Sequence, residues 1–390
     1  MSTGARPGRP EPVHGPATVV VMVVTIALGL AAVAVSTGGQ SALGLTGSRL
    51  AGMSPWLLAL AAATAAVAWL LVRARRSAVR LTLAVLASGA VLAHGVVTTQ
   101  LLAVGWRVGV VVNPWSVAQR GAPSDAPDAR VRYLTDAGED LSVAVWEPAG
   151  PGAPVLFYVH GGGWVGGDPE HRAVQLRWFA EQGWLVVGVQ YSHSDARRHL
   201  WDVVPAQVGC ALVWAAEHAV DHGGDPSRIV VVGDSAGGNL AVNLAYRSAR
   251  GDAPSACPGR VPRVVAVAGL YPVLDPVGFH DVGGPLGPSA RRMASAYLGG
   301  TPEEVPERYR DVDSTTYVSA EAPPTLLLVP GSDRLVPASD AEAFADRARQ
   351  AGVDVTEARF PYLDHAFDRD ALPDALYRRV TDQWLREHVR

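Results

Sequence analysis

An uncharged apolar run near the N-terminus sets the first limit on how this chain can fold. Residues 17–35 read ATVVVMVVTIALGLAAVAV and contain no ionisable side chain. At about 1.5 Å per residue, a helix of this length crosses most of a hydrocarbon core roughly 30 Å thick. Two more apolar runs follow at 55–72 and 81–104. We therefore predict that residues 1–112 form a membrane region with about three transmembrane helices.

Two of these runs have an alternative interpretation. The third contains His94 and the polar residues Thr98, Thr99 and Gln100, so it could instead be a buried core helix. The first could be a signal peptide cleaved near its small-residue end, although its apolar run is longer than usual. Cleavage of the first run would leave the rest of the chain on the same side of the membrane, whereas loss of the third span would not.

The distribution of arginine predicts an orientation, because short loops that carry cations stay in the cytoplasm. The loop between the second and third runs carries Arg73, Arg75, Arg76 and Arg80, whereas the loop between the first and second carries only Arg49. With the N-terminus inside, three spans place the part of the chain that follows them on the extracytoplasmic side of the cell membrane.

The charge changes sign along the chain. The first 120 residues contain nine Arg and a single acid, Glu11, whereas the remaining 270 contain 24 Arg and 36 Asp or Glu. Nucleic-acid binding needs clustered cations, so an acidic second part argues against a nucleic-acid partner. Between the two parts, residues 113–130 are rich in Pro, Ala, Ser and Asp without a periodic apolar face, and we predict a linker there.

After this linker, short β-branched runs alternate with longer helical stretches, a pattern typical of a mostly parallel sheet covered on both faces. We predict a doubly wound α/β domain over residues 131–390, a length that suits one large fold. The expected strands are 141–146, 154–159, 184–191, 228–232, 263–269, 324–329 and 353–360. The expected helices are about 169–182, 202–221, 236–249, 338–351 and 371–388.

Residues 275–320 interrupt this alternation. The segment is rich in Gly and Pro and contains a candidate helix near 289–298. It follows the strand expected at 263–269, a position where a lid over an active site can be inserted. We therefore predict a lid insertion over about 275–320.

The clearest chemical signal is the sequence Gly233-Asp234-Ser235-Ala236-Gly237, which lies between the strand IVVV and a helix. A Ser on such a sharp strand-to-helix turn must adopt a strained backbone, and the glycines two residues on either side remove side chains that would collide. The hydroxyl is then held away from the sheet, beside the positive end of the helix dipole. We predict that Ser235 is a nucleophile and that Asp234 orients the turn.

A second glycine-rich turn lies 75 residues upstream of this serine, where the strand VLFYVH runs into His160, Gly161, Gly162 and Gly163. Successive glycines leave backbone N–H groups open to a negatively charged oxygen. A phosphate-binding loop is the rival interpretation, but its GxxxxGK[ST] motif needs a lysine, and this chain contains none. We predict an oxyanion hole formed by the N–H groups of Gly162, Gly163 and Ala236, with His160 in a structural hydrogen-bonding role.

A nucleophilic serine needs a base, and the base needs an acid that fixes its tautomer. Asp333 follows the apolar strand TLLLVP, and His365 follows the strand VTEARFPY. Open α/β sheets bind ligands at such strand ends, and the chain order Ser, Asp, His fits. Asp364 competes for the acid role, but a residue adjacent to His365 usually points away from its ring, and Asp340 is a weaker candidate inside a helix. We predict a triad of Ser235, Asp333 and His365.

The remaining candidates carry less information. Cys210 and Cys257 are too few and too far apart for a zinc module or a CxxC pair. They are either one disulfide of an extracytoplasmic domain or two buried thiols. His193 and His199 have no nearby carboxylate pattern, so we predict surface or lid residues and not metal ligands. We therefore expect no metal site.

These motifs resemble those of the α/β-hydrolases and, within them, the hormone-sensitive-lipase-like esterases. The resemblance covers roughly residues 130–390 and rests on HGGGW at 160–164, GDSAGG at 233–238, and the surroundings of the predicted acid and base. It implies a Ser-Asp-His triad, an oxyanion hole of backbone N–H groups, no cofactor and hydrolysis of carboxylic esters. The sequence departs from the family at 191–194, which read YSHS where relatives often carry Tyr-Arg-Leu-Ala-Pro, a difference that concerns the acyl pocket and not the triad.

Together these features favour an integral membrane serine esterase with an extracytoplasmic catalytic domain that acts on a small-molecule or lipid ester. Short esters are the default expectation. Two other functions fit parts of the sequence. The acyl group could pass to a lipid or cell-wall hydroxyl and not to water, or the chain could be an inactive binding module displayed at the membrane. The sequence does not indicate an oligomeric state.

Overall fold

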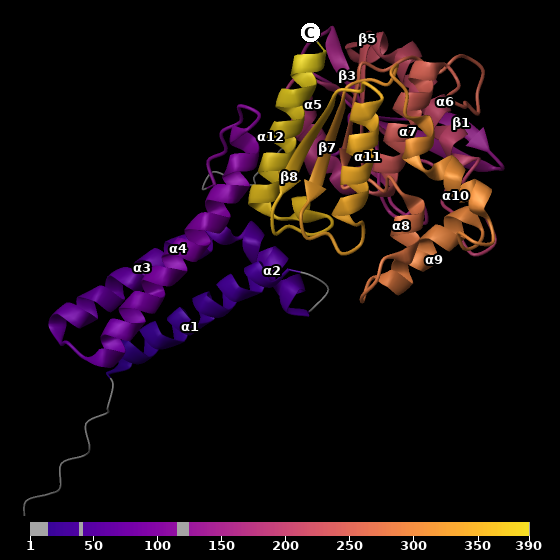
Figure 1. The fold of residues 1–390 in the computed structure, drawn as a ribbon. Helices are drawn as coiled ribbons and strands as arrows, with labels where there is room; N and C mark the ends of the chain where they lie inside the picture. The colour runs from indigo at the N-terminus through magenta and orange to yellow at the C-terminus, as the bar shows by residue number, and fades with distance from the viewer. Residues whose placement is uncertain (1–14, 39–41, 115–124, 390) are drawn as a thin grey trace, which may run out of the picture. The chain divides into compact units, whose positions relative to one another are not determined.

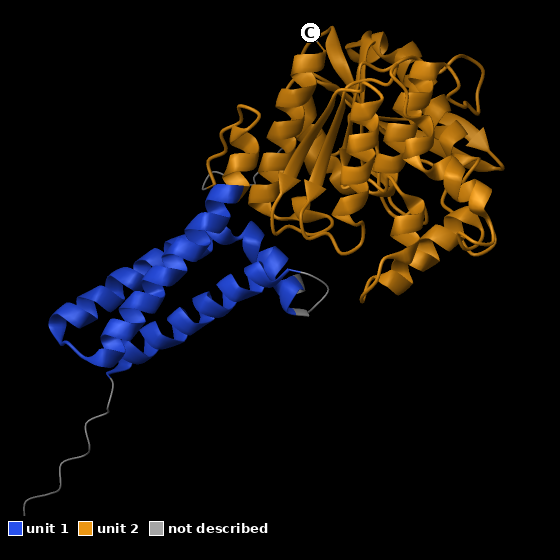
Figure 2. Ribbon diagram, in the orientation of Figure 1, with its two compact units in different colours: residues 1–38, 42–100 blue, residues 39–41, 101–390 orange. Residues whose placement is uncertain are grey.

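The computed structural model describes residues 15–38, 42–114 and 125–389. It divides into two compact units, which Figure 2 shows in different colours. The first unit comprises residues 1–38 and 42–100, and the second comprises residues 101–390 with 39–41. Most of the predicted linker at 113–130 lies outside the described residues.

The first unit is helical. Its helices are α1 Pro16–Thr37, α2 Ala42–Gly52, α3 Ser54–Ala74 and α4 Ala78–Trp106, the last of which continues into the second unit. In the described part of the chain, α1, α3 and α4 are long and apolar enough to cross a membrane, and they contain the three apolar runs of the sequence. Large apolar side chains stand on their outer faces, and Leu30 and Leu92 are 62% and 72% exposed. Such surfaces suit lipid better than water.

Two polar residues of the third run, His94 and Thr98, form hydrogen bonds inside this helical unit. His94 is buried, and its Nε2 lies 3.2 Å from the backbone oxygen of Leu28 on α1. Thr98 donates its hydroxyl to the carbonyl of His94, one turn earlier, at 2.8 Å. Polar side chains of membrane helices normally face the bundle interior and pair in this way. The polar character of this run is therefore compatible with a span.

Helix α2 was not expected from the sequence, because its 11 residues contain no long apolar run. Gly47 explains how this helix packs. A Cβ at this position would overlap the backbone of Ala34 on α1. Glycine therefore permits a close approach of two helix backbones that any other residue would prevent.

The second unit is built on an eight-stranded sheet in the order β1-β2-β4-β3-β5-β6-β7-β8. The strands are β1 Ala129–Asp136, β2 Glu139–Trp146, β3 Ala153–Val159, β4 Leu185–Val189, β5 Gly224–Asp234, β6 Ala266–Leu270, β7 Thr325–Pro330 and β8 Val355–Phe360. β2 pairs antiparallel with both β1 and β4, and the other neighbours are parallel. The predicted mostly parallel sheet is confirmed, and each expected strand overlaps an observed one.

Strand β1 was missing from the expected strands, and its first residues fall at the end of the predicted linker. Its sequence ARVRYLTD alternates partly buried and exposed side chains at one edge of the sheet. Such an edge strand carries too few apolar residues to stand out as a buried run.

Helices cover both faces of the sheet, as the sequence predicts (Figure 1). They are α5 Ala173–Glu181, α6 Val204–His218, α7 Ala236–Arg250, α11 Ala338–Gln350 and α12 Ala371–His388. α5 packs against α12 through the rings of Phe179 and Tyr377, whose centres are 6.4 Å apart. α7 packs against α11 through Tyr246 and Phe344, at 5.8 Å. The unit is therefore a doubly wound α/β fold.

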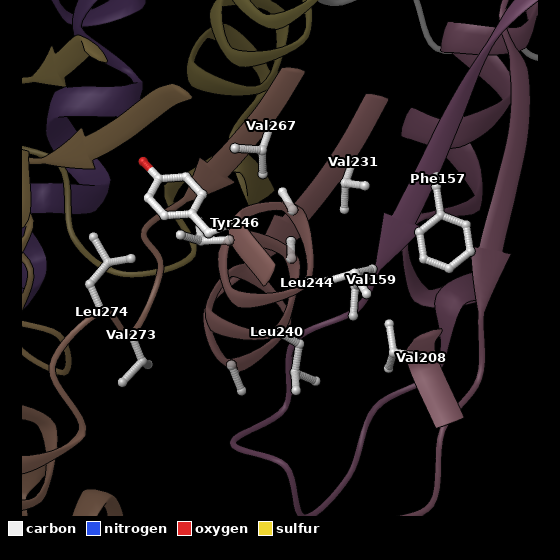
Figure 3. Packing of buried hydrophobic residues seen from close by; sticks show 14 of the residues in the cluster. Phe157, Val159, Val208, Val231, Leu240, Leu244, Tyr246, Val267, Val273 and Leu274 are labelled. Atoms are coloured by element: carbon white, nitrogen blue, oxygen red, sulfur yellow. The ribbon is translucent and has the colours of Figure 1, made fainter. Parts of the chain in front are cut away.

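The main core lies between the sheet and its helices (Figure 3). Phe157 on β3, Val231 on β5 and Val267 on β6 belong to one cluster with Leu240 and Leu244 of α7. All five side chains are at most 5% exposed. Burial stabilises the fold by about 1.5–3 kcal/mol for each side chain of this size. This packing holds α7, and with it the turn that precedes α7, against the sheet.

The insertion at 275–320 contains three helices, α8 Pro276–Asp281, α9 Gly287–Leu298 and α10 Pro306–Val312. α9 coincides with the helix expected near 289–298. The insertion is anchored to α7, because the side-chain amides of Asn239 and Asn243 both donate to the carbonyl of Val312, at 2.8 and 2.9 Å. Both asparagines are buried, so the end of α10 is fixed to the helix that follows the serine turn.

Cys210 of α6 forms a disulfide with Cys257, 47 residues later in the chain. The sequence left open whether these residues are bonded or are two buried thiols. The structure has the bonded form, which ties α6 to the loop after α7. Disulfides form and persist in oxidising compartments and are rare in the cytoplasm.

Candidate active site

The turn between β5 and α7 holds Ser235 in a strained conformation. Its φ of 54° and ψ of −121° lie outside the regions normally open to a residue with a side chain. A Cβ on Gly233 would overlap the carbonyl of Gly237, and a Cβ on Gly237 would overlap the carbonyl of His160. These two glycines therefore make the turn possible, as the sequence motif requires.

Ser235, His365 and Asp333 form a hydrogen-bonded chain. The Oγ of Ser235 lies 3.0 Å from Nε2 of His365, and Nδ1 of His365 lies 2.8 Å from Oδ2 of Asp333. The other oxygen of Asp333 accepts the backbone N–H groups of Leu335 and Val336, at 2.9 and 2.8 Å. The Asp333 side chain is 1% exposed, so its carboxylate is held in one orientation. This arrangement favours the His365 tautomer whose Nε2 can accept the proton of Ser235.

Parallel strands bring these three side chains together from distant parts of the chain. Ser235 follows β5, Asp333 comes after β7, and His365 comes after β8. The carboxyl ends of parallel strands lie at one edge of a sheet, so residues 130 positions apart can meet there. Tyr271, which follows β6, lies at the same edge, and its ring centre is 4.5 Å from that of His365. No motif in the sequence indicates a role for this tyrosine.

The competing acids lie elsewhere. Asp364 accepts the backbone N–H of Arg334 at 2.9 Å and also pairs with the Arg334 guanidinium. Asp340 lies on α11 and close to Asp275, which caps α8. Burial, together with the charge of Asp275, raises the pKa of Asp340 to about 6. Asp333 is therefore the carboxylate that the structure places on His365.

The loop after β3 approaches the serine turn and leaves backbone donors free. A Cβ on Gly161 would lie 3.1 Å from the Cβ of Ser235. The N–H of Gly161 is already used, because it donates to Oδ1 of Asp234 at 3.0 Å. No hydrogen bond among the described residues takes the N–H of Gly162 or of Gly163, whose φ values are 126° and 61°. Those two N–H groups remain available to a bound oxygen.

His160 supports this loop from within the fold. Its ring stacks on Tyr191 with 4.2 Å between centres, and its Nδ1 lies 2.7 Å from the carbonyl oxygen of Gly161. Burial lowers the pKa of His160 to about 4, so the ring is neutral near pH 7. His193 packs edge-on against His160, at 5.8 Å. His193 is only partly buried, and the structure places its ring beside the glycine loop.

The insertion packs directly on the glycine loop. Trp164, the residue after the glycines, is fully buried and has a φ of 60°. Its ring stacks on Tyr297 of α9 with centres 4.6 Å apart, and Phe279 of α8 meets it edge-on at 5.9 Å. Met293 of α9 covers Gly163 so closely that a Cβ on Gly163 would overlap its sulfur. The insertion therefore packs on this loop and holds it in place.

An open groove of about 740 Å³ runs along α9. Val165 and Met293, which lie next to the glycine loop, line this groove, and so do His199 and Gly300. His199 is fixed to α9, because its Nδ1 lies 2.7 Å from the carbonyl oxygen of Ala296 on that helix. Part of the groove therefore lies beside the residues that carry the free N–H groups.

Metal ligands do not gather anywhere in the described part of the chain. Among residues 15–38, 42–114 and 125–389, no group of three or more His, Cys, Asp and Glu side chains could hold a metal ion. The polar groups at the serine turn are instead occupied with one another, through the hydrogen bonds given above.

Three features define the class of this protein: the strand order, the strained serine between β5 and α7, and the histidine after the last strand. Together they are those of an α/β-hydrolase fold with a serine-hydrolase arrangement of side chains. Residues 144–347, which make up more than half of the chain, match the BD-FAE family model. The chain therefore belongs to the BD-FAE family. The predicted fold and the resemblance to α/β-hydrolase esterases are confirmed.

Relatives with assigned names match the same region. The chain is 34% identical over 227 residues to the probable carboxylic ester hydrolase LipM of Mycobacterium tuberculosis, a match that covers 55% of this chain and 50% of LipM. It is 30% identical over 266 residues to ethyl acetate hydrolase of Pseudomonas putida, which covers 63% of this chain and 78% of that protein. The chain thus spans about half the length of the first of these relatives.

Solved structures support the fold. Esterase 2 of Thermogutta terrifontis with bound propionate superposes with a TM-score of 0.55 at 23% identity, over 68% of this chain and 96% of that one. At this level of sequence identity, the match supports only the fold of the second unit.

Proposed function

We propose that the protein is a carboxylic ester hydrolase in which Ser235 is the nucleophile, His365 the base and Asp333 the acid. The observation that carries this proposal is the hydrogen-bonded chain of 3.0 and 2.8 Å that joins the three side chains. The names of two relatives, a probable carboxylic ester hydrolase and an ethyl acetate hydrolase, support the same reaction. Nothing in the chemistry of the site requires a cofactor.

The reaction proceeds in two halves. Ser235 Oγ attacks the ester carbonyl carbon while Nε2 of His365 accepts the hydroxyl proton. The tetrahedral oxyanion is stabilised by the N–H groups of Gly162, Gly163 and Ala236, the first residue of α7. The protonated histidine then gives its proton to the departing alkoxide, which leaves an acyl-serine and a free alcohol. A water molecule, deprotonated in turn by His365, attacks the acyl-serine and releases the carboxylic acid.

The second part of the proposal is the location. Helices α1, α3 and α4 are taken as three spans of a membrane region over residues 1–112, with the N-terminus inside. This places the catalytic domain, residues 131–390, on the extracytoplasmic side of the cell membrane. The cluster formed by Arg73 in the last turn of α3 and by Arg75 and Arg76, which lie between α3 and α4, supports this orientation. The Cys210–Cys257 disulfide also suits an extracytoplasmic domain.

Labelling with a membrane-impermeant fluorophosphonate tests chemistry and orientation together. On intact cells we expect the wild-type protein to be labelled and the Ser235→Ala variant to remain unlabelled, because the probe forms a bond only with an activated serine. Labelling that needs prior lysis of the cells would reverse the orientation and leave the hydrolase intact. Absence of labelling in both conditions, with the protein shown to be folded, would favour the inactive binding module.

We further propose that the groove along α9 receives the larger part of the ester and that Met293 limits its size. Met293 covers Gly163 and lines the groove, so a substituent that leaves the oxyanion site along α9 must pass this side chain. Short esters avoid this contact, and they remain the expected substrates of the wild-type protein.

Met293→Ala should therefore broaden the substrate range. We expect kcat/KM for long esters to rise about tenfold relative to acetate esters. Removing a methylene from a hydrophobic pocket changes the discrimination between long and short substrates by about 1–3 kcal/mol. The measurement is kcat/KM for two ester series, one of increasing acyl length and one of increasing alcohol length. Met293→Leu, which conserves volume, serves as the control. An unchanged profile in both series would exclude the groove as the binding site.

A further inference from the structure

One buried arginine joins the loops that carry the nucleophile and the base. Arg172 ends the 3-10 turn η2 Pro169–Arg172, a few residues after the glycine loop, and its side chain is only 15% exposed. Its guanidinium lies between two carboxylates, Asp234 and Asp368, which are 11% and 0% exposed. Nη2 donates to Oδ2 of Asp234 at 3.3 Å, and Nη1 pairs with Asp368. Neither the sequence motifs nor the mechanism uses Arg172.

On one side of this cluster, Asp234 is connected to the turn that carries the nucleophile. Asp234 directly precedes Ser235 and ends β5. Its Oδ1 accepts the hydroxyl of Tyr158 at 2.5 Å and the N–H of Gly161 at 3.0 Å. The carboxylate of Asp234 thus connects the serine turn with the glycine loop, and Arg172 holds its second oxygen.

On the other side of this cluster, Asp368 is connected to the base, His365. Asp368 lies in the 3-10 turn η5 Phe367–Arg369, three residues after His365. Its Oδ1 accepts the hydroxyl of Tyr271 at 2.8 Å, and the same hydroxyl contacts Nη2 of Arg172. The ring of Tyr271 in turn packs on the ring of His365, at 4.5 Å. Tyr271 has a φ of 39°, a conformation that its surroundings must hold in place.

The chemistry of this cluster needs a guanidinium. A planar fork with five donors can engage two carboxylates and a hydroxyl at once, whereas an ammonium is a compact point charge that cannot span the same partners. Burial alone would lower the pKa of Arg172, but the neighbouring Tyr271 and Asp234 raise it well above its ordinary value, so the charge is permanent.

We infer that Arg172 is a positioning residue that sets the distance between the nucleophile and the base by fixing Asp234 and Asp368 to one rigid group. The inference rests on the proposed function, and it goes beyond the triad and the oxyanion hole. A purely structural role would make Arg172 important for stability alone. A positioning role makes the Ser235–His365 contact depend on it, because a misplacement of about 1 Å can cost roughly 10²-fold in rate.

The variant Arg172→Lys, in the full chain, distinguishes these roles. We expect kcat for a short soluble ester to fall about 10- to 100-fold while KM changes by less than about threefold, since the groove along α9 is untouched. Arg378→Lys is the matched control. Arg378 is 16% exposed and pairs with Asp374 at 2.8 Å within α12, so its replacement should lower thermal stability to a similar degree and leave kcat unchanged.

Asp368→Asn breaks the same link from the other side. If Arg172 acts through Asp368, the double variant Arg172→Lys/Asp368→Asn should lose little more activity than either single variant. A loss of kcat in the double variant equal to the product of the two single losses would contradict the link. Equal kcat losses in Arg172→Lys and Arg378→Lys, or no loss in Arg172→Lys, would overturn the inference.

A crystal structure of the Arg172→Lys protein gives a readout that does not depend on turnover. We expect the distance from Ser235 Oγ to His365 Nε2 to exceed the 3.0 Å of the wild-type chain. An unchanged distance would overturn the inference even if ester hydrolysis is confirmed. Failure of the wild-type protein to hydrolyse any ester would count against the proposed function, and the distance would still decide the role of Arg172.

Discussion

Ser235→Ala should abolish ester hydrolysis, with kcat reduced by about 10⁴-fold or more. The hydroxyl removed is the one that lies 3.0 Å from Nε2 of His365, and the variant has no atom at that place to attack a carbonyl carbon. The remaining site can still orient an ester and stabilise an oxyanion, so residual turnover would reflect attack by water. The measurement is steady-state hydrolysis of a short chromogenic ester at equal protein concentrations, with the active sites of the wild type alone counted by fluorophosphonate titration.

The fold should survive this change. The turn is made possible by Gly233 and Gly237, and alanine at position 235 meets the same backbone restriction at φ 54° as serine does. We therefore expect the thermal midpoint of Ser235→Ala to stay within a few degrees of the wild type. Ser332→Ala is a suitable control, because Ser332 directly precedes the acid and yet has no place in the hydrogen-bonded chain. Substantial turnover in Ser235→Ala would remove the serine from the mechanism.

Much of the fold could be predicted because apolar patterning is a local property. The run at 324–329 is almost entirely apolar, as expected for a strand covered on both faces, and it appears in the structure as β7 Thr325–Pro330, one residue from the expected place. β1 and α2 were not predicted, because neither contains a long apolar run. The edge strand alternates exposed arginines with half-buried residues, and α2 packs through the backbone at Gly47, which leaves no apolar signature.

The hydrogen-bonded chain of Ser235, Asp333 and His365 could be proposed because its parts stand at strand ends in a fixed order. A parallel sheet brings such ends to one edge, so chain order and strand position together restrict which side chains meet. The adjacency argument against Asp364 agrees with the structure, in which that carboxylate turns to Arg334.

The contacts around the site could not be predicted, because they join segments that no local pattern links. Arg172 lies 196 residues from Asp368 in the sequence, and nothing near either residue indicates that they pair. The stacking of Trp164 on Tyr297 likewise joins the glycine loop to an insertion whose own sequence shows only Gly, Pro and a short helix. Such contacts depend on the three-dimensional course of the chain.

Asp333→Asn should reduce kcat by roughly 10⁴-fold, the second-largest effect that we expect. The asparagine amide can donate to Nδ1 of His365, which favours the tautomer that carries its proton on Nε2. That tautomer faces Ser235 with a donor and cannot accept the hydroxyl proton. The shape of the site is preserved, because the amide oxygen can still accept the N–H groups of Leu335 and Val336.

Asp364→Asn is the matched comparison, since it makes the same chemical change in the carboxylate next to His365. Asp364 pairs with Arg334, whose side chain is only 5% exposed, so its neutralisation should cost up to about 3 kcal/mol of stability. Its kcat should nevertheless remain within about tenfold of the wild type, because Asp364 does not contact His365 in the structure. The two variants are compared by kcat for a short ester and by thermal unfolding. A large kcat loss in Asp364→Asn together with near-normal turnover in Asp333→Asn would transfer the role of the acid from Asp333 to Asp364.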